Sequence, residues 1–174
     1  MRSTRLAIGL LGLIGWGWTT TSPAFATAEL HNDPKGFQGI EWGASLKGRP
    51  ELKQTYAGPR VGEYEIKDSS PALDTIPVAS LLLVTVEGKF ARVTVRYKGE
   101  AVHKQVLAYL ETRFGPLDKT PGQMVRGLNQ QYNWRGPETE INLTYEGRSE
   151  RGFVFFDSRT LAPRFNDGIT DSAE

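Results

Sequence analysis

Two neighbouring runs in the middle of the chain have the hydrophobic pattern of β-strands. Residues 78–86 are almost entirely β-branched and aliphatic, and within residues 90–97 the side chains from Ala91 to Tyr97 alternate between apolar and polar. Glu87-Gly88-Lys89 lies between them and supplies a turn. Alternation with a period of two is typical of a half-buried strand. The two runs therefore predict a β-hairpin, whose first strand is central and covered on both faces because three leucines follow one another at 81–83.

A helical pattern follows directly. Between residues 100 and 114 apolar side chains recur every three or four positions, and Gly115-Pro116 comes next. This spacing makes one apolar stripe, and glycine followed by proline is a common helix end. We therefore predict a helix over residues 100–114 with His103 on its solvated side. The residues of the stripe are Val102, Val106, Leu107, Leu110 and Phe114.

The remaining pattern is mostly strand. Residues 130–135, 139–146 and 152–157 read as three strands, the last one covered on both faces, and residues 64–66 as a short one. Residues 49–56 read as a short helix, because Pro50 suits a first helical turn. Residues 68–77 and 117–128 read as loops. The order of strands, helix and strands predicts an α+β fold, in which an antiparallel β-sheet carries one main amphipathic helix on one face.

The N-terminus has the three parts of a secretory signal peptide. Arg2 and Arg5 are followed by the uncharged apolar stretch 6–18 and by Ala24-Phe25-Ala26, a small-residue cleavage signal. An apolar stretch of this length is too short for a membrane span of about 20 residues. We expect residues 1–26 to be removed. The rest is then an extended leader (27–36), a single domain (37–162) and a disordered tail (163–174).

The composition of the chain limits where in the cell the protein is found and which classes of molecule it binds. The chain has no cysteine, so a lipid anchor on an N-terminal cysteine and disulfides are both ruled out. Loss of Arg2 and Arg5 with the signal peptide changes the formal charge from +1 to −1. A chain this close to neutrality has no general attraction for nucleic acid or anionic lipid. These features predict a bacterial periplasmic or secreted protein with no membrane span.

Catalytic and metal motifs are missing from the sequence. Thiol chemistry needs cysteine, and His31 and His103 are too far apart in sequence for a zinc motif. We therefore predict no catalytic residue, metal or cofactor. One enzymatic alternative stays open, since Glu63 with Glu65, or Glu138 with Glu140, could supply the two carboxylates of a glycan hydrolase. The simpler interpretation is a charged sheet edge that discourages aggregation.

The candidate binding residues are cationic and aromatic. Arg92 and Arg96 project from one face of the 90–97 strand, with Lys98 two residues on and Arg135 on a later strand. An open face of this kind would suit a carboxylate, a phosphate or an acidic partner. The alternative is a solvated face paired with glutamates. Tyr97 and Trp134 could line a groove beside these cations, or they could close the core.

Several short motifs recur together in one group of proteins. They are Phe37-x-Gly39-Ile40-x-Trp42-Gly43 after the signal peptide, Phe114-Gly115-Pro116 at the helix end, Trp134-x-Gly136, and Thr139-x-Ile141-x-Leu143-x-Tyr145. With the hairpin, this order resembles small, uncharacterised bacterial envelope proteins. The resemblance spans most of the exported chain. It implies the same fold and location, and no activity or site residue comes with it.

Three functions fit the sequence. The first is a non-enzymatic periplasmic or secreted module that binds an envelope protein or a small ligand. The second is the cell-envelope glycan hydrolase, and the third is a carrier of an apolar ligand between the helix and the sheet. The sequence leaves the identity of the partner and the oligomeric state open.

Overall fold

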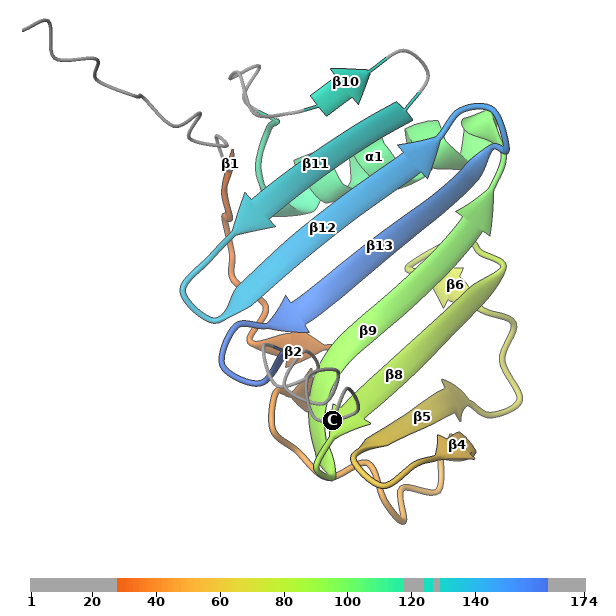
Figure 1. The fold of residues 1–174 in the computed structure, drawn as a ribbon, viewed down its shortest axis with the longest axis vertical. Helices are drawn as coiled ribbons and strands as arrows, with labels where there is room; N and C mark the ends of the chain where they lie inside the picture. The colour runs from red at the N-terminus through yellow and green to blue at the C-terminus, as the bar shows by residue number, and fades with distance from the viewer. Residues whose placement is uncertain (1–27, 118–123, 127–128, 163–174) are drawn as a thin grey trace, which may run out of the picture.

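The computed structural model describes residues 28–117, 124–126 and 129–162. Most of them form one sheet in the order β1-β11-β12-β13-β9-β8-β5-β4, and β10 also pairs with β11 (Figure 1). The one helix of the described residues is α1, Glu100–Phe114. The strands of the sheet are β1 Ala28–Glu29, β4 Leu52–Ala57, β5 Val61–Ile66, β8 Ser80–Val86, β9 Lys89–Lys98, β10 Met124–Arg126, β11 Asn129–Arg135, β12 Thr139–Glu146 and β13 Arg151–Ser158.

The predicted hairpin and helix are confirmed. Strands β8 and β9 pair antiparallel, with a bulge between Val84 and Thr85. The helix begins after Gly99 and ends at Gly115, whose backbone N–H donates to the carbonyl of Glu111 over 3.1 Å. Gly115 has φ 109°, a left-handed conformation in which glycine is not strained. The apolar stripe thus places the helix, and glycine marks its end.

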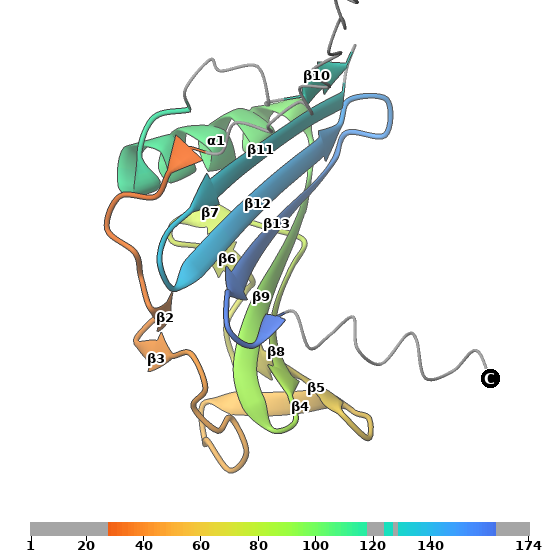
Figure 2. The ribbon, with the colours of Figure 1, turned by 60° about the vertical axis from the view of Figure 1, so that its left-hand side comes forward.

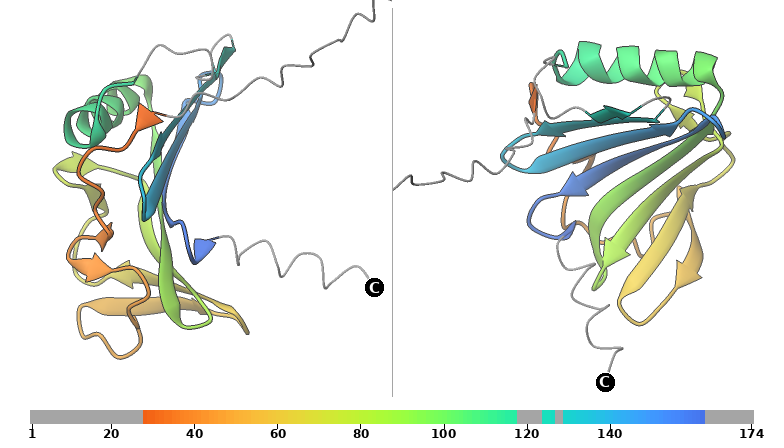
Figure 3. Two further views of the ribbon diagram at one scale, coloured as in Figure 1. Left: turned by 90° about the vertical axis from the view of Figure 1, so that its left-hand side faces the viewer. Right: turned by 45° about the horizontal axis from the view of Figure 1, so that its top comes forward.

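The helix and two small hairpins cover one face of the sheet. The hairpins are β2 Gly36–Phe37 with β3 Ile40–Glu41, and β6 Ala72–Leu73 with β7 Ile76–Pro77. They lie on the same side as α1 (Figure 2; Figure 3, left). On the other side no described helix or strand packs against the central strands (Figure 3, left).

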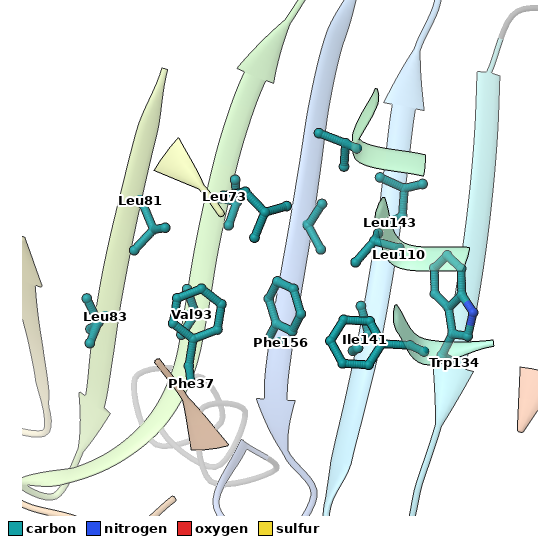
Figure 4. Close-up of a cluster of buried hydrophobic side chains, with 14 of the residues drawn as sticks. Phe37, Leu73, Leu81, Leu83, Val93, Leu110, Trp134, Ile141, Leu143 and Phe156 are labelled. Atoms are coloured by element: carbon teal, nitrogen blue, oxygen red, sulfur yellow. The ribbon is translucent and has the colours of Figure 1, made fainter. Parts of the chain in front are cut away.

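The hydrophobic core fills the space between α1 and the sheet. Leu110 of the helix lies with Trp134, Ile141 and Leu143 on one part of the sheet, and Phe37 reaches Phe156 with ring centroids 5.2 Å apart (Figure 4). These side chains are almost completely buried. Burial of this much apolar surface is the main force that holds the helix on the sheet.

Residues 49–56 contain a strand where the sequence predicts a short helix. Leu52–Ala57 form β4, which pairs antiparallel with β5. Gly58-Pro59-Arg60 makes the turn between them, and the N–H of Gly58 donates to the carbonyl of Val61 over 2.8 Å. A strand partner directly after a turn outweighs the weak helix preference of Lys53 and Gln54.

The leader at residues 27–36 takes part in the sheet. Ala28–Glu29 form β1, which pairs parallel with β11, so the sheet is mixed and not purely antiparallel. Asp33 holds the leader against the start of β12, because its Oδ2 accepts hydrogen bonds from the N–H groups of Glu138 (2.7 Å) and Thr139 (3.1 Å). Burial raises the pKa of Asp33, but hydrogen bonds from Thr139, Glu138 and Lys35 outweigh burial and hold the pKa below its usual value.

Some predictions fall outside the described residues. These are the signal peptide at residues 1–26, most of the 117–128 loop and the tail at 163–174. In the predicted 68–77 loop the structure has the small β6–β7 hairpin. No helix in the described part of the chain has the length and apolar character needed to cross a membrane.

Candidate functional site

The face of the sheet opposite α1 is the candidate site, and we call it the open face. Cross-strand pairing defines which side chains share it, because residues directly paired on adjacent strands point to the same side. Along the chain these residues are Glu29 on β1, Glu63 on β5, Ser80, Leu82 and Val84 on β8, Arg92, Thr94, Arg96 and Lys98 on β9, Asn129, Gln131, Asn133 and Arg135 on β11, Glu140, Asn142, Thr144 and Glu146 on β12, and Arg151, Phe153, Phe155 and Asp157 on β13.

Two phenylalanines occupy the middle of the open face. Phe153 and Phe155 are half-buried, with ring planes within 6° and centroids 6.4 Å apart. The guanidinium carbon of Arg92 lies 5.1 Å from the centroid of the Phe155 ring, which is a cation–π contact. Aromatic area of this kind is costly to leave in contact with water and is enriched at the centres of protein interfaces.

At one end of the open face the charges are paired. Arg92 holds Asp157 by two hydrogen bonds of 2.5 and 3.1 Å, and Arg135 lies 3.8 Å from Glu140. Asn133 also donates to Glu140 over 2.7 Å. Burial raises the pKa of Asp157, and Arg92 opposes that shift without cancelling it. A hollow of about 290 Å³ lies here, but Arg92 and Arg135 already bind its two carboxylates, and the third arginine of its wall, Arg159, donates to the carbonyl of Gly136 over 2.7 Å.

At the other end the cations are unpaired. Arg96, Lys98 and Arg151 are all exposed, and none of them forms an ion pair within the described residues. Arg151 stands directly opposite Lys98, and Arg96 directly opposite Phe153. Like charges placed opposite each other destabilise a sheet. A second hollow of about 360 Å³ borders Arg151 and Phe153, together with Gln131 and Thr144.

Trp134 lies on the covered face and not beside the arginines. It is completely buried, and its indole N–H donates to the carbonyl of Gly115 over 2.9 Å. The contact ties β11 to the end of α1. Of the two sequence interpretations, the core role is the one that this geometry supports.

Tyr97 is also buried, in a polar cluster under the helix. Its hydroxyl lies 2.8 Å from Nδ1 of His103, whose Nε2 lies 2.9 Å from Oε1 of Gln130. The His103 ring stacks on Tyr145 with centroids 4.0 Å apart. His103 is 3% exposed, so the prediction of a solvated histidine is wrong. Burial lowers the pKa of His103, which favours the neutral ring.

The carboxylates proposed for a hydrolase are spread over the sheet. Glu63 and Glu65 lie on β5. Glu138 directly precedes β12 and Glu140 lies in it, and three strands separate the two pairs. Glu140 is engaged by Arg135 and Asn133. Among the described residues no group of three or more His, Asp or Glu side chains is arranged to hold a metal ion.

A larger hollow of about 620 Å³ lies at the end of α1, beside the β2–β3 hairpin. Its cations are Lys35 and Arg113. Arg113 stands in the last turn of the helix, where a cation complements the negative end of the helix dipole, and Glu41 adds an opposite charge to the same wall. This hollow therefore has an internal explanation for its charges. The filled core under α1 gives the carrier hypothesis no support.

Sequence reasoning identified Arg92, Arg96 and Arg135 on the open face and missed Phe153, Phe155 and Arg151. The run of apolar residues at 153–156 predicted a strand covered on both faces, and the structure shows that one of its faces is only half-buried. Nothing in the sequence distinguishes a strand covered on both faces from one whose aromatic residues stay partly exposed on one face. Leu82 on β8 lies on the same face and is also half-buried.

Comparison of the chain with protein-family models, with curated proteins and with solved structures finds no match in any of the three.

Proposed function

We propose that this protein is a non-enzymatic module of the bacterial periplasm or cell exterior, and that it binds an envelope protein through the open face. The observation that carries the proposal is the half-buried pair Phe153 and Phe155 at the centre of a sheet face that no described element covers. Large exposed patches with apolar centres and polar rims are typical of interaction sites.

The chemistry around the pair fits binding better than catalysis. Hydrolysis of a glycan needs two carboxyl groups facing one substrate, one of them able to act as an acid or base. On the open face, Asp157 and Glu140 are held by arginines and an amide, which leaves them as structural charges. The other polar groups near the phenylalanines are cations, amides and one carboxylate, Glu146, which accepts a hydrogen bond from Ser149. Groups of this kind recognise a partner without reacting with it.

Site-specific photocrosslinking in the native envelope tests this proposal. A photoreactive amino acid replaces Phe153 in one variant and Gln105, an exposed residue of α1, in the control. We expect one dominant crosslinked protein from position 153 and none from position 105. Equal crosslinking from both positions, or none from position 153, would contradict an open-face partner.

A further inference from the structure

The unpaired end of the open face carries a more specific inference, which rests on the proposed function. Its charged groups are Arg96 and Lys98 on β9, Arg151 on β13 and, on β12, Glu146. Glu146 stands opposite Arg151, but its carboxylate accepts a hydrogen bond from Ser149 over 2.7 Å and forms no ion pair. The four groups together leave an excess of two positive charges around Phe153.

Ion pairs within the described residues do not account for these three cations. At the paired end, Arg92 and Arg135 stabilise buried or half-buried carboxylates of the same sheet. At the unpaired end, Arg151 and Lys98 face each other across two strands, which costs stability and gains no internal ion pair. Glu146 lies opposite Arg151 on the other side but forms no ion pair with it, so the described residues hold one carboxylate against three cations and leave most of their positive charge available to a partner.

We propose that this end of the open face binds an extended acidic segment of a protein, with acidic side chains at alternate positions. Arg96 and Lys98 are two residues apart on one strand, and alternate residues of any extended chain repeat at about 6.6–6.8 Å. Carboxylates with that repeat match the two cations in register. Arg151 supplies a third contact from the next strand, and Phe153 contacts the backbone and aliphatic carbons of the segment.

The spread of the cations argues against other anions. A single phosphate is held by donors that converge on one point, whereas these three side chains extend over two strands around an aromatic ring. A lipid surface requires apolar side chains that enter the bilayer. In the described part of the chain, Tyr56 is the exposed large apolar residue, and it lies on β4 at the far edge of the sheet.

The test measures binding of a labelled peptide of alternating Asp and Val to the exported chain by fluorescence anisotropy. Two double variants change the net charge equally. Arg96→Glu with Arg151→Glu alters the proposed site, whereas Lys35→Glu with Lys47→Glu alters exposed lysines on either side of the β2–β3 hairpin. We expect salt-sensitive binding that the first variant weakens about tenfold or more and the second leaves within about twofold. Circular dichroism of both variants confirms that they fold.

Several outcomes would overturn the proposal. Equal losses in the two variants would show an effect of net charge alone, and equal binding of a Lys–Val peptide would show no selection for acid. Stronger binding to vesicles with anionic phospholipid than to the peptide would indicate a membrane. Full competition by inorganic phosphate would indicate a compact-anion site.

The crosslinking experiment separates failure of this inference from failure of the proposed function. If Arg96→Glu with Arg151→Glu abolishes peptide binding and also the crosslink from position 153, both stand. If the crosslink persists in that variant, the open face still binds a partner but not through an acidic segment. If no crosslink forms even in the parent chain, the proposed function itself fails.

Discussion

Replacing Trp134 with alanine is expected to lower the free energy of unfolding by about 3–5 kcal/mol, the usual cost of removing a fully buried tryptophan. The side chain is completely buried between β11 and the end of α1. Its indole N–H also satisfies the carbonyl of Gly115 at the helix end. The substitution removes the apolar contact and leaves that carbonyl without its partner, so both effects act in the same direction.

Trp134→Phe is the matched control, because it keeps most of the ring and removes the hydrogen bond. We expect it to cost about 1–3 kcal/mol, the penalty for a buried group left unsatisfied. Urea unfolding followed by circular dichroism measures both values. Binding through the open face should be unchanged in Trp134→Phe, because the residue lies on the opposite face. A loss of binding without a loss of stability would show that Trp134 takes part in binding after all.

Gly152→Ala is expected to cost about 3 kcal/mol, at the upper end of the range for overpacking a core. Gly152 on β13 is paired with Tyr97 on β9, and a Cβ at position 152 would overlap the Tyr97 ring. Tyr97 cannot move away easily, because it is 3% exposed and bonded to His103. The change therefore disturbs the polar cluster as well as the packing.

A double-mutant cycle checks the cause of that loss. With Tyr97→Ala already present, the ring is absent, and Gly152→Ala should then cost less than about 1 kcal/mol. Unfolding in urea gives the four stabilities that the cycle needs. If Gly152→Ala costs the same in both backgrounds, the backbone of β13 and not the tyrosine ring sets the need for glycine.

The periodic elements of the fold could be predicted from the sequence. The helix at 100–114 has an apolar stripe and a glycine end, and the β8–β9 hairpin has alternation and a turn, so local pattern and tertiary structure agree. The strand at Leu52–Ala57 could not, because its local preference is weak and pairing with β5 determines it. The parallel pair of β1 with β11 joins residues more than a hundred positions apart and has no local signal.

The candidate site could be predicted only in part, because a strand pattern shows that two faces exist but not which one is covered. Arg92 and Arg96 alternate with buried residues, so their shared face was predictable. That Arg92 is paired and Arg96 is not could not be predicted, since it depends on Asp157, which lies on the neighbouring strand β13 but 65 positions later in the chain. Trp134 and Tyr97 looked available as aromatic residues, but their positions in the register place them on the covered face.

The central claim is that the open face is left free for a partner, and the absence of cysteine from the chain allows a direct test. A single cysteine replaces Thr144, which borders the 360 Å³ hollow, and another replaces Gln105 on α1 as the control. The rate of modification by a soluble maleimide is measured for the purified protein and for the same variant in the bacterial envelope, where the proposed function places it. The account predicts that position 144 reacts readily when purified and becomes at least about tenfold slower in the envelope, with position 105 equal in both. Equal rates at position 144 in both preparations would contradict it.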